Sequence, residues 1–324
     1  MAIFFRAPFQ TLLHIRRIDA LLFLMSLIWG TNYVIVKRAF LEIDPQAFNA
    51  IRMAVASTVF VAAMVAIRRW PSEPGADGSL ASVLYTPSRM SKRDVVGLAA
   101  LGVVGQSLYQ YWFVGGLART SVANAAVMLA GAPVLIAIIS AALGEERITP
   151  THWVGVFLSL AGIYIVVGAG VHLGGATWVG DLMMFGAVCC WAIYTLGSRP
   201  LMTRHSPLAV TGISMALGTA LYIAAVFPQI RAVAWARVTA GTWIAIVYSA
   251  LFALCLSYTI WYAAVRQIGS ARTSVYSNLV PLVAMATATL FLHEPLGFRK
   301  IVGAAAVLVG VALTRVKVPN PNPE

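Results

Sequence analysis

The sequence has little charge and therefore little that water would solvate. Only 10% of its residues are charged, whereas 60% are hydrophobic. Soluble domains carry roughly 25% charged residues. The scarcity of charge excludes an ordinary soluble fold and predicts an integral membrane protein that contacts the lipid bilayer.

Cysteine, histidine and phosphate-binding motifs are scarce as well. The three cysteines, Cys189, Cys190 and Cys255, fall inside apolar runs without paired spacing. No histidine has a second histidine four residues later, and no G-x-x-x-x-G-K-S/T motif occurs. We therefore expect no metal, no cofactor, no direct use of ATP and no enzyme activity.

Long apolar runs, by contrast, are abundant. A helix needs about 20 apolar residues to cross a hydrocarbon core about 30 Å thick. Ten runs have about this length: 18–37, 46–67, 95–116, 121–143, 150–169, 178–198, 206–228, 241–265, 272–292 and 299–316. They predict an all-α integral membrane protein with ten transmembrane helices, five in each half.

The two halves repeat one another. Four pairs are separated by 162 residues: Trp29 and Trp191, Lys37 and Arg199, Pro45 and Pro207, Met53 and Met215. Four later pairs are separated by 148 residues: Pro133 and Pro281, Glu146 and Glu294, Gly155 and Gly303, Gly162 and Gly310. A fixed internal period determines the architecture. Because five crossings leave the chain on the opposite side, the second repeat is expected to be inverted, as in many secondary transporters.

Lysine and arginine predict the orientation. If the N-terminus is cytoplasmic, 15 basic residues lie in inside loops and seven in outside loops. Both termini are therefore expected in the cytoplasm, and the protein in the cell (inner) membrane as a multi-pass protein. The net charge of +12 is then orienting charge at helix ends, and we expect no nucleic-acid partner.

Several short motifs resemble a known family. Trp29-Gly30-Thr31-Asn32-Tyr33 and Lys37 precede Pro45, Phe48 and Arg52, and further matches are Pro133 with Glu146, Ser277 with Pro281 and Glu294, and Gly155 with Gly162. As a set they resemble the drug/metabolite transporter (DMT) superfamily over residues 20–316, in particular its ten-helix EamA-type members, which include metabolite and amino-acid exporters. Glu145 and His293 replace the family's usual glycine, and Ser214 stands where the first half has Arg52.

The resemblance also implies a division of the chain. Residues 18–169 would form a first EamA-type repeat and residues 178–316 a second. The basic residues predict that residues 1–17 are a cytoplasmic segment, and three prolines predict a disordered tail at residues 317–324.

Polar and aromatic residues recur at helical spacing within several runs, and lipid offers such groups no hydrogen-bond partner. These faces should point into the bundle. Eight mid-span residues are candidates for the wall of a substrate cavity: Trp29, Asn32, Gln106, Tyr109, Gln110, Trp191, Tyr194 and Asn278. The alternative for each is a hydrogen bond between helices. For Trp112, Trp261 and Tyr262, which lie near span ends, a place in the interfacial aromatic belt is an equal alternative.

Charged and proline residues suggest further roles. Arg52 lies about 10 Å into its helix at 1.5 Å per residue, and we assign it a gating or structural role. Pro133 and Pro281, at equivalent positions, are expected to bend their helices. Asp19, Asp94 and Asp181 begin predicted helices and are expected to cap them, whereas Glu294 is expected to have a structural role in a turn.

The kinds and positions of the charged residues disfavour some classes of transported solute. No carboxylate lies mid-membrane, which disfavours a proton-coupled carrier of cationic drugs, and a single deep arginine disfavours phosphorylated solutes. We expect export of a small neutral or zwitterionic metabolite, most of all an amino acid, by alternating access. Alternatives are a drug, other metabolite or nucleotide-sugar-type carrier, a channel, or a membrane partner protein without transport; a homo-oligomer is also left open.

Overall fold

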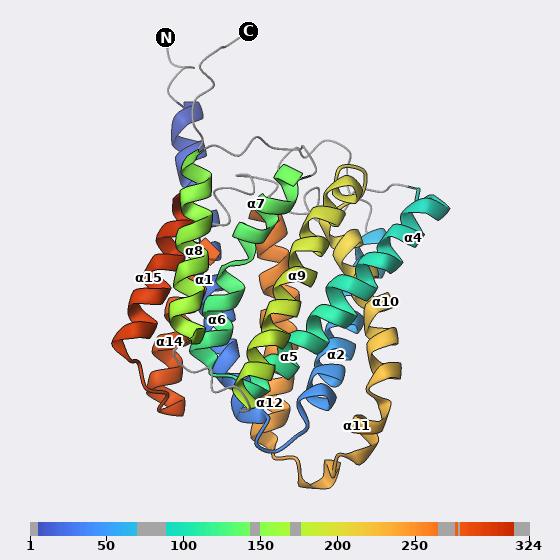
Figure 1. Ribbon diagram of the computed structural model, residues 1–324. Coiled ribbons are helices and arrows are strands. Elements are labelled where there is room, and N and C mark those ends of the chain that lie inside the picture. Colours follow the sequence, from blue (N-terminus) through green and yellow to red (C-terminus); the bar gives the residue numbers. More distant parts are fainter. Residues whose placement is uncertain are drawn as a thin grey trace.

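The protein is a bundle of helices and has no strand among the residues that the structure describes. The computed structural model describes residues 6–69, 89–142, 150–168, 176–264, 276–277 and 279–313. The long helices run alongside one another in a single bundle (Figure 1). The predicted all-α class is confirmed.

The helices match the predicted spans closely. In the first half they are α1 (Arg6–Ala39), α2 (Pro45–Arg69), α4 (Lys92–Leu101), η1 (Gly102–Leu108), α5 (Tyr109–Arg119), α6 (Val122–Ala130), α7 (Ala132–Ala142) and α8 (Pro150–Gly168). In the second half they are α9 (Ala176–Met202), α10 (Pro207–Ala225), α11 (Phe227–Ala232), η2 (Trp235–Arg237), α12 (Ala240–Tyr248), η3 (Ser249–Leu256), α14 (Leu279–Leu292) and α15 (Phe298–Leu313). After η3 the chain remains helical to residue 264.

Length and hydropathy indicate a membrane environment. Five helices are long and apolar enough to cross a bilayer: Ile18–Ala39, Pro45–Ile67, Thr177–Met202, Pro207–Ala225 and Ala240–Ala264. The distribution of side chains agrees, because Phe157 is 64% exposed and Tyr164 is 76% exposed, whereas Arg52 is only 2% exposed. Apolar groups outside and polar groups inside are the reverse of a soluble protein, and suit lipid as the solvent.

Equivalent helices of the two halves run in opposite directions. We call the end of the bundle where α1, α4 and α10 begin the near end, and the end where α2, α6 and α9 begin the far end (Figure 1). Helix α1 ends at the far end, where its equivalent α9 begins. This reversal is what an odd number of spans in each repeat requires.

Two contacts between equivalent residues mark the axis that relates the halves. The hydroxyls of Ser57 on α2 and Thr219 on α10 are 2.8 Å apart and 162 residues apart in sequence. Ser159 on α8 donates to the carbonyl oxygen of Val307 on α15 at 3.3 Å, across 148 residues. Equivalent residues can touch only where the two copies meet, so α2 with α10 and α8 with α15 form the junction between them.

The third and eighth spans each contain a π-helical segment, and these segments are also equivalent. In the third span η1 covers Gly102–Leu108, and in the eighth η3 covers Ser249–Leu256. Adding 148 to the bounds of η1 gives 250–256, which is η3 without its first residue. π-Helical turns are rare and often occur at functional sites. Both segments are therefore candidates to line such a site in the interior of the bundle.

The predicted cap at Asp94 is confirmed, and the other two predicted caps are wrong. Ser91 and Asp94 form a reciprocal capping box at the start of α4. Asp19 lies inside α1, which begins at Arg6, and Asp181 lies inside α9, which begins at Ala176. Both helices start before the apolar run does, so these two carboxylates are not in a first turn.

The fourth span is interrupted next to the predicted bend. Helix α6 ends at Ala130, Gly131 forms the turn, and α7 starts at Ala132. Pro133 therefore lies in the first turn of a new helix, where its missing N–H is not needed. Pro281 lies in α14, and residues 276–277, just before the undescribed Asn278, are also helical.

Candidate functional site

A continuous cluster of aromatic side chains occupies the middle of the bundle. Trp191 on α9 is the hub, with ring centroids 5.4 Å from Tyr109, 6.1 Å from Tyr194 and 6.1 Å from Tyr258. Tyr258 in turn meets Trp29 of α1 at 6.0 Å. These separations lie in the range where aromatic pairs attract, so four helical segments from both halves meet through their rings.

Trp29 and Trp191 hold equivalent positions and similar surroundings. Each is partly buried and packs against three separate clusters of buried apolar residues. The indole N–H of Trp29 donates to the carbonyl oxygen of Ala253, within η3, at 2.9 Å. In the other half, the ring of Tyr194 lies against Gly105 of η1, where a Cβ atom would be 2.0 Å from the ring. Each π-helical segment thus receives an aromatic side chain from the opposite half.

A buried arginine lies beside this cluster. Arg52 on α2 donates through Nη1 to Ser249 Oγ at 3.0 Å and through Nη2 to Gln110 Oε1 at 2.8 Å, and Nη2 also donates to Asn49 Oδ1. All three acceptors are neutral, and no carboxylate of the described residues forms an ion pair with Arg52. The guanidinium fork therefore joins α2 to the beginning of η3 and to the helix that follows η1.

Two candidate amides are buried without a complete set of partners. Gln106 in η1 is 0% exposed, and neither its Oε1 nor its Nε2 has a hydrogen-bond partner among the described residues. Asn32 is also buried, and its Oδ1 has no partner. Leaving a buried polar group unbonded costs about 1–3 kcal/mol, so these groups are the ones a water molecule, a solute or another conformation would satisfy.

The structure therefore brings together most of the predicted cavity residues. Trp29, Tyr109, Trp191 and Tyr194 join the aromatic cluster, and Gln110 joins Arg52. Gln106 and Asn32 are buried, but their unpartnered amide atoms form no hydrogen bond with that cluster among the described residues, and Asn278 lies outside the described residues.

Sequence reasoning left three contributors out of the candidate set: Asn49, Ser249 and Tyr258. Asn49 could have been found, because it precedes Arg52 by three residues and shares its helix face. Trp261 and Tyr262, for which a belt position was an alternative, instead contact Trp29 at 5.8 Å and Tyr258 at 6.5 Å respectively.

A small pocket adjoins the aromatic cluster at the near end. It is lined by Tyr258 and Tyr262 together with residues that include Phe60, Pro207 and Thr211, and it encloses about 10 Å³. That is about the space accessible to one water molecule. The pocket is thus too small for a metabolite in this conformation, but it lies between the start of α10 and the rings of the cluster.

At the far end, polar contacts tie the short segment Thr120–Asn124 to both halves. Lys37 Nζ donates to the carbonyl oxygen of Thr120, and the hydroxyl of Thr120 donates to Asp181 Oδ1. Glu294 accepts from the backbone N–H of Val122 at 2.9 Å and of Ala123 at 3.4 Å. Glu294, expected to be structural in its turn, thus caps α6 from the opposite half.

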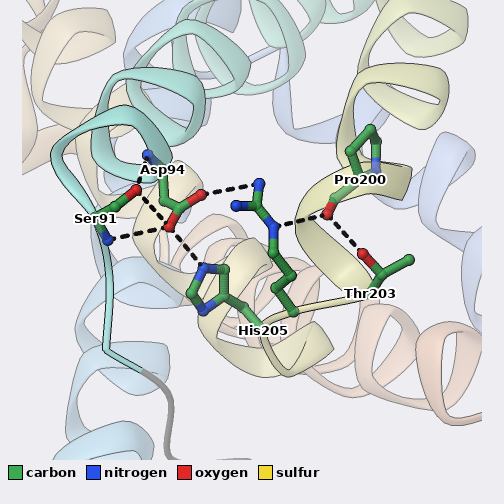
Figure 2. A network of polar contacts seen from close by, with 6 residues as sticks. Ser91, Asp94, Pro200, Thr203 and His205 are labelled. Carbon is green, nitrogen blue, oxygen red and sulfur yellow. Dashed lines mark hydrogen bonds and ion pairs between the residues drawn. The ribbon is translucent and has the colours of Figure 1, made fainter.

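At the near end, a charged cluster fastens α4 to the turn between α9 and α10 (Figure 2). Arg204 Nη2 lies 3.0 Å from Asp94 Oδ1, and His205 Nε2 lies 3.3 Å from Asp94 Oδ2. The hydroxyl of Ser91 also donates to Asp94 at 2.8 Å.

The far end has an equivalent clamp with the charges arranged differently. Glu42, 162 residues before Arg204, accepts from the hydroxyls of Thr239 at 2.8 Å and Thr242 at 2.8 Å. Thr239 and Thr242 follow Ser91 and Asp94 by 148 residues. Each end thus has one clamp that joins a turn of one half to the start of a π-containing span of the other.

The near-end clamp predicts a pH-dependent stability. Hydrogen bonds from Ser91, then His205 and the charge of Arg204, lower the pKa of Asp94 to about 2, from about 3.9 in an unfolded chain. The carboxylate therefore stabilises the fold above about pH 4, and this contribution is lost as pH falls from about 4 to about 2. We expect Asp94→Asn to lower the thermal unfolding midpoint in detergent at neutral pH, and the difference from wild type to shrink over that acid range. A difference that is constant with pH would contradict this assignment.

Comparisons with known proteins agree with this architecture. The model of the EamA-like transporter family matches residues 16–168 and again residues 178–316. The uncharacterized transporter YyaM of Bacillus subtilis is 27% identical over 240 residues, which cover 71% of this chain and 77% of that protein. An uncharacterized transporter of Archaeoglobus fulgidus is 28% identical over 302 residues, or 92% of this chain and 96% of the relative.

Two further similarities concern function and fold. A probable terminal-alkyne amino-acid exporter of Streptantibioticus cattleyicolor is 27% identical over 227 residues, covering 69% of this chain and 74% of that protein. A solved crystal structure at 18% identity superposes with a TM-score of 0.64 over 92% of this chain and 97% of the other, which shows a shared fold. The chain belongs to the EamA-like transporter family, and it is a membrane transporter rather than an enzyme.

Proposed function

We propose that the protein exports small neutral or zwitterionic metabolites, above all amino acids, across the cytoplasmic membrane by alternating access. The observation that carries the proposal is the aromatic cluster around Trp29 and Trp191, formed by both halves and flanked by Arg52. The similarity to a probable amino-acid exporter supports the substrate class.

The chemistry of the cluster suits such a solute. Aromatic faces bind apolar side chains and attract an ammonium group through cation–π contacts, which are worth about 0.5–2 kcal/mol. Gln110 and Arg52 lie beside the rings and supply hydrogen-bond donors. No carboxylate is among the residues that form the cluster or its polar flank, which argues against a drug carrier that selects cations.

The two ends of the bundle support alternating access. We propose that residues 18–169 and 178–316 move as two repeats, and that the near end is cytoplasmic, as the basic residues predict. Segment Thr120–Asn124 closes the far end by its contacts with Lys37, Asp181 and Glu294. The small pocket beside Tyr258 lies on the near side. Closure at the far end, the Asp94 clamp at the near end and a near-side pocket of only about one water molecule correspond to a stage of the cycle that is closed to both sides.

Transport by purified protein in liposomes tests the proposal. Labelled amino acids and other metabolites would be offered to vesicles preloaded with the unlabelled solute, with and without a pH gradient. Saturable uptake that is accelerated by counterflow is expected for at least one zwitterionic solute. Flux that rises linearly without saturation would indicate a channel, and acceleration only by phosphorylated or cationic solutes would refute the substrate class.

The aromatic hub provides a matched test. Trp191→Ala is expected to lower transport efficiency about tenfold, since several ring contacts worth about 0.5–1.5 kcal/mol each are lost. Tyr109→Ala should act in the same direction. Trp153→Ala is the control, because Trp153 is 44% exposed on α8 and, among the described residues, its ring pairs with that of Phe157 alone. Equal losses in folded Trp191 and Trp153 variants would refute the assignment of the cavity.

A further inference from the structure

We propose that Asp181 is a proton-binding site that controls the opening of the far end. The inference rests on the proposed function, since it concerns the gate of that transporter. Asp181 lies in α9 and is 6% exposed. Asp181 does not cap its own helix, and its partners belong to the other half of the chain. It therefore links the two halves at the far end.

The surroundings of Asp181 provide hydrogen bonds but no counter-charge. Thr120 donates its hydroxyl to Asp181 Oδ1, and the side-chain amide of Asn124 also interacts with the carboxyl group. Among the described residues, no lysine, arginine or histidine lies within ion-pair distance of it. A carboxylate that is removed from water without a cation partner is disposed to take up a proton.

The charged groups of neighbouring elements all have other partners. Arg119 on α5 donates to the carbonyl oxygen of Gly115 and contacts Met183 Sδ. Lys37 on α1 donates to the carbonyl oxygen of Thr120 and interacts electrostatically with Glu294 and Lys300. Glu294 accepts from the start of α6. Protonation of Asp181 would therefore remove one negative charge without breaking an ion pair.

A ready acceptor exists for the added proton. Asn124 is 8% exposed, and its Oδ1 is buried without any hydrogen-bond partner. A half-turn of the side-chain amide exchanges its donor for this acceptor, so that a protonated Asp181 can donate to Asn124 Oδ1. One proton is taken from the far-side solution and bound to a carboxyl oxygen, and no other species is consumed.

The proton would loosen the contact that closes the far end. Hydrogen bonds to a carboxylate are roughly twice as strong as those between neutral groups. Protonation weakens the bond from Thr120, and Thr120 belongs to the same short segment that Lys37 and Glu294 hold. Acid outside the cell should therefore favour the outward-open state, and counterflow should accelerate as the external pH falls.

The variant Asp181→Asn tests this directly, because it resembles the protonated group in shape and charge. We expect its counterflow to lose dependence on external pH and to stay at the rate that wild type reaches in acid. Glu42→Gln is the matched control, since Glu42 also accepts threonine hydroxyls at the far end but is exposed; it should keep the wild-type profile. An Asp181→Asn protein with the wild-type pH profile would overturn the proposal, as would dependence of the wild-type rate on sodium instead of pH.

Two measurements need neither a substrate nor that variant. Infrared difference spectra of wild type should gain a carboxylic-acid C=O band on acidification, and Thr120→Val should move its midpoint to higher pH, because a donor to the charged form is lost. Amide hydrogen exchange in Thr120–Asn124 should be faster in Thr120→Val than in wild type at the same pH. An unshifted band or unchanged exchange would refute the proton site even if amino acids prove not to be substrates, whereas failure of counterflow alone would refute only the proposed substrate.

Discussion

Arg52→Leu is expected to reduce transport by two orders of magnitude or more while the protein still folds. The substitution removes the fork that joins α2 to Gln110 and Ser249, and leaves three neutral acceptors without their donor. Each orphaned acceptor costs about 1–3 kcal/mol. Removing a buried charge that lacks a counter-ion offsets much of this, because burying such a charge costs several kcal/mol. We therefore expect a small change in the free energy of unfolding but a large change in the geometry of the site.

Two comparisons make the Arg52 result specific. Arg52→Lys should recover part of the activity, because an ammonium group retains the charge but cannot match the planar fork. Ser214→Ala is the control at the equivalent position of the other half, where the hydroxyl bonds within its own helix to Thr211 and meets Tyr194 at 3.4 Å. Initial rates of counterflow would be measured on monodisperse protein. Normal transport by Arg52→Leu, or an equal loss in Ser214→Ala, would contradict the role of the fork.

Gly310→Val is expected to have the largest effect on stability. A Cβ at Gly310 would lie 2.3 Å from Ser159 Oγ and 2.5 Å from the carbonyl oxygen of Gly155, both on α8. Because backbone stands in the way, α8 and α15 would have to separate along the junction between the halves. Overpacking typically costs about 1–3 kcal/mol and occasionally more. Because the backbone of α8 cannot move aside, we expect Gly310→Val to cost an amount near the upper end of this range.

Thermal unfolding in detergent would measure the effect of Gly310→Val, together with the yield of monodisperse protein. Gly297→Ala is the control, because nothing lies within 4 Å of the Cβ position at Gly297. The control should unfold at the wild-type temperature. If Gly310→Val did so as well, α8 and α15 would not be packed as closely as their glycines indicate.

The spans were predictable from sequence because they depend on a property summed over many residues. A run of 20 apolar residues has one stable arrangement in lipid, and α2 and α10 begin within one residue of the predicted start. The starts of α1 and α9, which precede Asp19 and Asp181, could not be predicted in this way. Both helices continue beyond their apolar runs.

The candidate site was predictable only in part. Helical spacing selected Trp29, Tyr109 and Trp191, because the N–H and O–H groups of these side chains find no hydrogen-bond partner in lipid. It could not show that Arg52 binds Ser249, since that contact joins residues 197 positions apart. The π-helical segments were also missed, because local propensities carry no signal for a widened turn.

The paired π-helical segments bear on the history of the gene. π-Helix accounts for well under 1% of residues in proteins, yet it occurs at matching positions of the third and eighth spans, in η1 and η3. Two independent origins would have had to place this rare element at the same position twice. A single ancestral segment that already carried the widened turn, and was then duplicated and fused, explains both. The irregular turn is thus older than the two-repeat chain, and it has survived while Arg52 and Ser214 diverged.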